Sequence, residues 1–232
     1  MDLFCSCVVL VIVKIRCEEY DKVCPNWVGV AGGDPALPGE FPHMAAIGYG
    51  DEKDITWNCG GTLISEKFIL TAAHCVSSRE SGPARWVLLG TVLLINTTAT
   101  DGKNGQIHPI TRRIRHPEYK APAKYHDIAL FEIGPAVTPN PRPMNLKELH
   151  PACLSTNRTF PGRKAIASGW GRVGHADDGS SNLLKVQLDI FELSVCQKAY
   201  EVEIRSTNQL RRGIVNTMLC AGVLEGKRDT CQ

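Results

Sequence analysis

The amino-acid sequence predicts an all-β fold, and two observations carry this prediction. Short apolar runs are broken repeatedly by glycine, proline, asparagine and aspartate, for example at residues 68–72, 86–89, 128–133 and 164–167. Helical patterns are scarce, and the best candidate is 194–203, with Ser194 as its expected N-cap. Many short strands of this kind are typical of a β-barrel or a β-sandwich, and the pattern alone leaves both open.

The clearest single strand is expected at residues 184–190. Its leucine, valine and isoleucine residues alternate with lysine, glutamine and aspartate. Successive side chains of a strand point to opposite faces, so a period of two predicts that one face is buried.

A proline-rich segment follows the first group of expected strands. Residues 134–143 carry four of the fourteen prolines. This composition predicts either a linker between two β subdomains or a long surface loop.

Cysteine content and charge narrow the class of protein. The 232 residues carry a formal net charge of +2 and no long block of like charge, so we expect neither a nucleic-acid partner nor a membrane surface. Ten cysteines indicate disulfides formed in an oxidising compartment. They lack the paired spacing of structural zinc sites, and we expect no metal ion and no cofactor.

The N-terminal segment suits secretion only in part. We interpret residues 1–16 as a degenerate signal peptide, because an apolar run of suitable length spans 3–13. Asp2 stands where a basic residue is usual, and Lys14 and Arg16 follow the run instead of preceding it. The expectation of an extracellular protein therefore rests mainly on the cysteines.

Two residues form the candidate catalytic pair. His74 ends an apolar run and precedes Cys75, whose disulfide would hold the loop in place. Asp127 opens the strongly apolar run 128–133 and should be partly buried. A buried carboxylate costs several kcal/mol unless it is paired, and a histidine is a natural partner. Such a carboxylate fixes the imidazole tautomer and stabilises the imidazolium formed in catalysis.

Several motifs resemble the chymotrypsin/trypsin family of serine proteases and occur in that family's order. They are CGGTLI at 59–64, LTAAHC at 70–75, DIAL at 127–130, SGWG at 168–171 and GKRDTCQ at 226–232. FPHMAA at 41–46 and HPEY at 116–119 further resemble arthropod clip-domain proteases of the snake and easter type.

The resemblance implies two antiparallel β-barrels, of which the second is incomplete, and a protease domain over residues 30–232. It implies that His74 acts as general base and then general acid, and that Asp127 orients it. The nucleophilic serine is expected in Gly-Asp-Ser-Gly-Gly, directly after Gln232. We therefore expect the 232-residue chain to have no measurable protease activity.

Asp229 is the expected substrate-binding residue. It occupies the position that, in the family, lines the base of the primary specificity pocket, where an aspartate pairs with arginine or lysine of a substrate. The alternative is a solvated loop aspartate beside Lys227 and Arg228.

The activation segment departs from the family pattern. Residues 17–29 are interpreted as a segment preceding the protease domain, and VAGG at 30–33 resembles the N-terminus that activation releases. Gly29 stands where a trypsin-like activator needs arginine or lysine, so activation by such a protease is in doubt.

The resemblance also supplies disulfide pairings. It implies Cys59 with Cys75 and Cys196 with Cys220. Cys153 is expected to pair with Cys17 or Cys24, and the sequence does not choose between them.

Two functions remain open from the sequence. The first is a serine endopeptidase that cleaves after arginine or lysine in an extracellular cascade, with protein substrates and serpin-type inhibitors as partners. The second is a non-catalytic protease homologue that acts as a regulatory binding module. Intact His74, Asp127 and Asp229 favour the first. The G-x-G-x-x-G pattern at 169–174 is followed by a loop-like segment rather than a helix, so we expect no nucleotide site.

Overall fold

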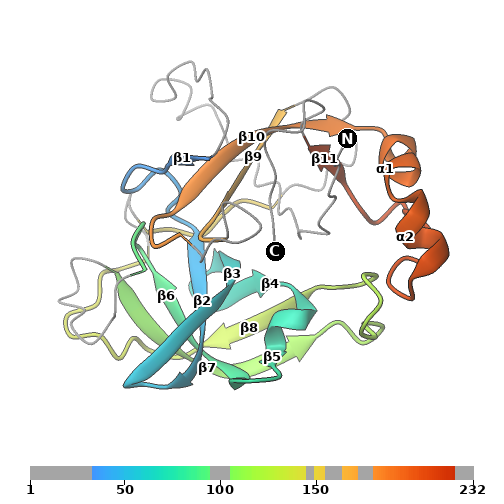
Figure 1. Ribbon diagram of the computed structural model, residues 1–232. Coiled ribbons are helices and arrows are strands. Elements are labelled where there is room, and N and C mark those ends of the chain that lie inside the picture. The colour runs from blue at the N-terminus through green and yellow to red at the C-terminus, as the bar shows by residue number, and fades with distance from the viewer. Residues whose placement is uncertain (1–32, 95–104, 145–148, 155–163, 172–179, 223–232) are drawn as a thin grey trace.

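A seven-stranded antiparallel sheet in the first half of the chain closes into a β-barrel (Figure 1). The computed structural model describes residues 33–94, 105–144, 149–154, 164–171 and 180–222. Around the sheet the strands follow in the order β2 (Met44–Asp51), β3 (Asp54–Ser65), β4 (Phe68–Thr71), β8 (Ala129–Ile133), β7 (Gln106–Arg115), β6 (Gly82–Leu89) and β5 (Ser77–Ser78). Because β2 also pairs with β6, the barrel is closed. The expected runs at 68–72, 86–89 and 128–133 are thus confirmed as strands.

The pairings of β2 with both of its neighbours are irregular near Gly48. The pairing with β3 is irregular between Ile47 and Gly48, and the pairing with β6 is irregular between Gly48 and Tyr49. A Cβ atom on Gly48 would lie 2.5 Å from a methyl of Ile55 and 2.7 Å from the ring of Trp57. A larger residue would therefore collide with these side chains, and glycine is required at this irregularity of β2.

The barrel interior is filled by apolar side chains from every long strand. In β8 the burial alternates, so that Ala129, Phe131 and Ile133 point inward. The largest side chains at less than 2% exposure in this cluster are Ile47, Tyr49, Leu63, Ile69, Val87, Leu89, Phe131 and Leu149. Burial of this many large side chains makes the barrel the most extensive described core of the chain.

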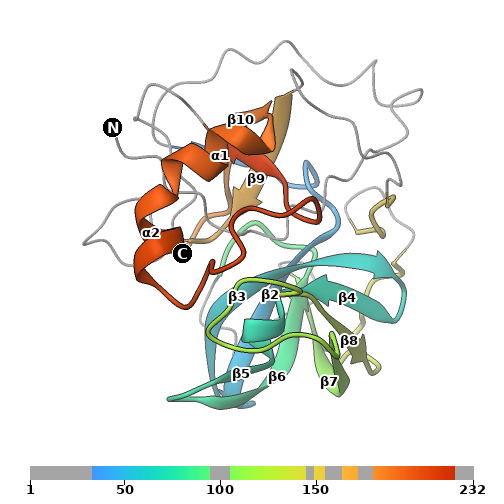
Figure 2. The same cartoon turned by 90° about the vertical axis from the view of Figure 1, so that its right-hand side faces the viewer.

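The later strands form a second antiparallel sheet, in line with the predicted all-β class. β10 (Leu184–Phe191) pairs with β1 (Asp34–Pro35), β9 (Lys164–Gly169) and β11 (Cys220–Gly222). Among the described residues this four-stranded sheet stays open. The helices α1 (Leu193–Ala199) and α2 (Glu201–Ser206) follow β10 at one end of it (Figure 2).

The expected strand and helix in this half need two corrections in detail. In β10 the buried face includes Lys185, while Leu184 and Val186 are only half-buried. The Lys185 ammonium lies 2.6 Å from Oε1 of Glu40, and this pairing makes burial of a lysine tolerable. Ser194 is not an N-cap: it lies inside α1, whose N-cap residue is Glu192.

The proline-rich segment is packed along the barrel. The Gly134 N–H donates to the Pro109 carbonyl, and the Val137 N–H donates to the Ile107 carbonyl. The hydroxyl of Thr138, a buried residue, accepts from the Ile107 N–H at 2.8 Å. These bonds to β7 make the segment a fixed surface loop of the first barrel.

A second apolar cluster joins the barrel to the later sheet. Met44, Leu88 and Ile107 of the barrel share it with Trp170 and Leu183. The indole N–H of Trp170 donates to the Val92 carbonyl at 3.1 Å, which satisfies its polar atom at the junction.

Candidate active site

The pairing of β4 with β8 brings the two candidate catalytic residues together. In this antiparallel pair Thr71 lies opposite Ala129. His74 follows Thr71 within the 3₁₀ turn η1 (Ala73–Val76), and Asp127 precedes Ala129. Both residues therefore leave the barrel at the same edge, although 53 positions separate them in the sequence.

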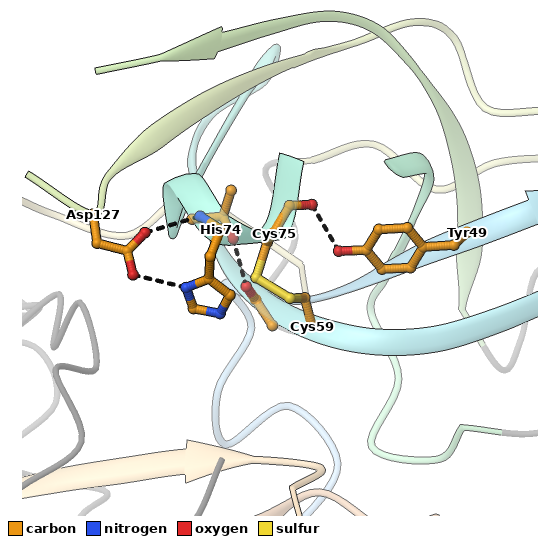
Figure 3. Close-up of a disulfide and its surroundings, with 7 residues drawn as sticks. Tyr49, Cys59, His74, Cys75 and Asp127 are labelled. Atoms are coloured by element: carbon orange, nitrogen blue, oxygen red, sulfur yellow. Dashed lines mark hydrogen bonds and ion pairs between the residues drawn. A yellow bond between two sulfur atoms is a disulfide. The ribbon is translucent and has the colours of Figure 1, made fainter. Parts of the chain in front are cut away.

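One carboxylate holds His74 at two points (Figure 3). The backbone N–H of His74 donates to Oδ1 of Asp127 at 2.9 Å, and Nδ1 of the His74 ring lies 2.7 Å from Oδ2. The double contact fixes both the position of the turn and the orientation of the ring.

Asp127 is held as a carboxylate by its partner. The residue is only 7% exposed. Burial raises its pKa, but hydrogen bonds from the side chain and backbone of His74, together with the positive charge of Lys124, outweigh burial and leave the pKa below its ordinary value. An ionised Asp127 accepts hydrogen bonds at both oxygens, so it requires a proton on Nδ1 of His74.

The other ring nitrogen of His74 is then free to accept a proton. With Nδ1 protonated, neutral His74 carries a lone pair on Nε2. The side chain is 34% exposed, which gives a substrate or solvent access to the ring. The arrangement suits general-base chemistry at Nε2, with the developing imidazolium stabilised by Asp127.

A disulfide fastens the turn that carries His74. Cys59 of β3 is bonded to Cys75 of η1, as expected. The hydroxyl of Tyr49 donates to the Cys75 carbonyl at 2.6 Å, and burial raises the pKa of Tyr49 to about 12. Figure 3 shows the tyrosine and the disulfide on the same side of the histidine, away from Asp127. Sequence reasoning missed Tyr49, because nothing in its local pattern marks it apart from a core residue.

The sequence of this chain matches a known protein family. The profile of the trypsin family, described as "Trypsin", matches residues 30–232. The chain belongs to the trypsin family of serine proteases. Its fold is also similar to a solved structure described as "Structure of GrC", with a TM-score of 0.62 and 25% identity over 84% of this chain and 76% of that one.

Individual relatives of this trypsin-family chain include arthropod proteases. It is 39% identical to serine protease snk of Drosophila melanogaster, over 95% of this chain and 53% of that protein. It is 34% identical to melanization protease 1 of Drosophila melanogaster, over 88% of this chain and 52% of that protein. It is 31% identical to venom serine protease Bi-VSP of Bombus ignitus, over 93% of this chain and 60% of that protein. The chain thus spans about half the length of these relatives.

The second expected disulfide of the trypsin-family chain is also confirmed. Cys196 of α1 is bonded to Cys220 of β11 and fastens the helix to the sheet. Cys153 is exposed and forms no disulfide with a described residue. Its expected partners Cys17 and Cys24 lie outside the described residues, so that pairing stays a prediction.

Other expected functional positions are not described by the structure. Asp229, Gly29 and residues 30–32 lie outside the described ranges. Among the described residues, no helix is long enough and apolar enough to span a membrane.

A turn before Asp127 is a further feature that sequence reasoning missed. His126 has a positive φ of 57°, and its carbonyl accepts from the Ile128 N–H at 2.7 Å. This tight turn directs the carboxylate of Asp127 toward η1. A positive φ is uncommon for any residue other than glycine, so the local sequence carries no clear signal for this turn.

Proposed function

We propose that this trypsin-family chain is part of a serine endopeptidase that cleaves after arginine or lysine. The observation that carries the proposal is the double contact between Asp127 and His74. A carboxylate that fixes both the backbone and the ring of one histidine is the arrangement needed to keep Nε2 available as a base.

In the proposed mechanism His74 takes the proton of a serine hydroxyl as that oxygen attacks the substrate carbonyl. Asp127 stabilises the imidazolium, and His74 then gives the proton to the leaving amine. The serine is expected in the family motif that would follow Gln232. The buried position of Asp127 strengthens its attraction for the imidazolium, because less water screens the two charges.

The specificity part of the proposal rests on Asp229. The family motif around this residue supports a place at the base of the primary pocket. A substrate guanidinium or ammonium would pair there with the carboxylate, whereas an apolar side chain would leave it unpaired.

The proposed setting is extracellular. Two disulfides in the described residues support an oxidising compartment. Three relatives are named as venom or melanization proteases. We propose protein substrates and inhibitors of the serpin type as partners. Residues 17–29 are proposed to precede a protease domain that starts at residue 30.

A second function is favoured by one observation. Gly29 replaces the basic residue that a trypsin-like activator needs. A homologue that is never activated could still bind other proteins with the same surface. This alternative is a regulatory module without proteolytic activity.

Labelling of the protein expressed from its complete transcript separates the two functions. A fluorophosphonate probe reacts with a serine that a histidine activates. The endopeptidase predicts stoichiometric labelling after cleavage at an arginine engineered at position 29, and loss of labelling in His74→Ala. Absence of labelling in the cleaved, folded protein would support the binding module instead.

A further inference from the structure

Two histidines and a glutamate converge beside the catalytic aspartate. His116, Glu118 and His126 each offer a ligand atom, and these atoms lie within 4.8 Å of one another. Among the described residues the only other group of this kind consists of Cys59, His74 and Cys75. Its two sulfur atoms are bonded to each other, so they are not available as thiolate ligands.

The barrel positions both histidines of this group. His116 directly follows β7, and its N–H donates to the Ile128 carbonyl at 3.0 Å. His126 lies on the neighbouring segment, just before β8, in the left-handed turn described above. The two imidazole rings are stacked, with centroids 4.8 Å apart and planes 14° from parallel. Their proximity is thus set by backbone structure and not by flexible loop ends alone.

Glu118 completes the group from the turn after β7. Its Oε2 lies 3.8 Å from Nε2 of His126, and its N–H donates to Nδ1 of His116 at 3.2 Å. The Glu118 side chain is 71% exposed and that of His126 is 25% exposed. The carboxylate can therefore move, and solvent ions can reach the group.

Contrary to the expectation from the cysteine spacing, we propose that His116, Glu118 and His126 bind one divalent transition-metal ion, with Zn²⁺ as the expected species. Two imidazoles and one carboxylate are a donor set that suits zinc, copper and nickel better than calcium or magnesium. Three protein ligands leave a fourth position of tetrahedral zinc for water.

Binding requires small rearrangements of this group. Ligand bonds of about 2.0–2.1 Å at tetrahedral zinc place nitrogen atoms roughly 3.3 Å apart, so the ligand atoms must approach one another by up to about 1.5 Å. If His116 binds through Nε2, its proton moves to Nδ1, and the bond from the Glu118 N–H is given up. Lys120 and Arg212 line the same surface hollow as Glu118 and His126, and their charges oppose a cation. We therefore expect moderate affinity.

The site's position connects it to the catalytic pair. His126 immediately precedes Asp127, so a metal ion on His126 would restrain the backbone turn that orients the carboxylate. The inference concerns metal binding itself and holds whether or not the chain is proteolytic.

Isothermal titration of the metal-free, disulfide-bonded protein with ZnCl₂ tests the proposal. We expect the protein to bind one equivalent of Zn²⁺ saturably. The affinity should fall at least tenfold in His126→Gln and in His116→Gln, and about threefold or more in Glu118→Gln. His150→Gln is the matched control, since this histidine lies outside the group, and its affinity should stay unchanged. His74→Gln separates the proposed group from the histidine of the candidate catalytic pair, and saturable binding should persist in this variant.

Imidazole ¹⁵N spectra of the same samples provide a readout that does not depend on variants folding. Zn²⁺ should shift the nitrogen resonances of His116 and His126 and leave those of His108 in place. The proposal is overturned by the absence of saturable binding, by binding that survives in both His116→Gln and His126→Gln, or by binding that disappears in His74→Gln.

Discussion

Thr71 and Ala129 lie opposite each other in the β4–β8 pair, and this register sets the position of the candidate catalytic pair, His74 and Asp127. His74 follows the first residue by one short turn, and Asp127 precedes the second by a tight turn at His126. The hydrogen bonds between His74 and Asp127 thus depend on a strand pairing between distant parts of the chain. A substitution that keeps this pairing can therefore impair catalysis and leave the fold intact.

Replacement of Asp127 by asparagine should nearly abolish turnover in the protein expressed from its complete transcript. The amide cannot hold the proton on Nδ1 of His74 as a carboxylate does, so the imidazole adopts the wrong tautomer. The expected loss in kcat is about 10⁴-fold, the magnitude typical of this substitution in a Ser-His-Asp triad. Steady-state kinetics with an arginyl amide substrate measures it. Asp189→Asn, an exposed carboxylate on β10, is the matched control and should keep kcat within about twofold.

Removal of the Cys59–Cys75 disulfide should destabilise the fold and loosen the turn that carries His74. The bonded cysteines are 16 positions apart, and closing a loop of that length contributes about 3 kcal/mol to the free energy of unfolding. The double variant Cys59→Ala, Cys75→Ala should lose this amount in denaturant unfolding. Val202→Ala, at a position that is 71% exposed, should change the free energy by less than about 0.5 kcal/mol. Equal stability of the double variant and the parent would contradict the prediction.

Acid should destabilise the protein through His43. Burial, and secondarily repulsion from His150, lower the pKa of His43 from 6.5 to about 4, and its Nδ1 has no hydrogen-bond partner among the described residues. Because the folded-state pKa is depressed, the unfolded chain binds the proton first, between pH 6.5 and about 4. The contribution of neutral His43 to the free energy of unfolding is fully present above the unfolded-state pKa. It is lost as the pH drops through this window, by roughly 3 kcal/mol in total.

The free energy of unfolding in urea should be compared at about pH 7.5, above this window, and at about pH 4.5, near its lower end. His43→Gln removes the titrating group, so it should lose less stability between the two pH values than the parent protein. Some pH dependence should persist, because burial also lowers the pKa of His108. An identical pH dependence in the parent and in His43→Gln would refute the assignment.

Asp229 should decide which peptide bonds are cleaved. In the protein expressed from its complete transcript and activated through an arginine placed at position 29, cleavage should follow arginine or lysine. Failure to pair the pocket carboxylate costs several kcal/mol, which corresponds to a preference on the order of 10³-fold or more in kcat/KM. A peptide library analysed by mass spectrometry gives the profile. Asp229→Ser should lose the basic preference, and an unchanged profile in this variant would show that Asp229 is not the pocket residue.

Much of the fold class could be predicted from local sequence. Short apolar runs indicated the positions of β4, β8 and β10, because a run of four to eight apolar or alternating residues bounded by turn residues is the local pattern of a buried or half-buried strand. Burial within a strand depends on its neighbours as well. Lys185 is buried because Glu40 lies 2.6 Å from its ammonium, and no pattern within residues 184–190 encodes that partner.

Contiguous motifs were enough to predict the family and the two described disulfides, and they named the two residues of the candidate catalytic pair. Each of these motifs can be recognised from adjacent residues alone, without knowledge of what lies beside them in space. How these parts meet depends on the tertiary structure. The antiparallel register of β4 and β8 places Asp127 within 2.7 Å of the His74 ring, and the ends of β7 and β8 bring His116 beside His126. Distances between residues far apart in sequence follow from strand pairing and closure of the barrel, which depend on the packing of the whole chain and not on any one segment.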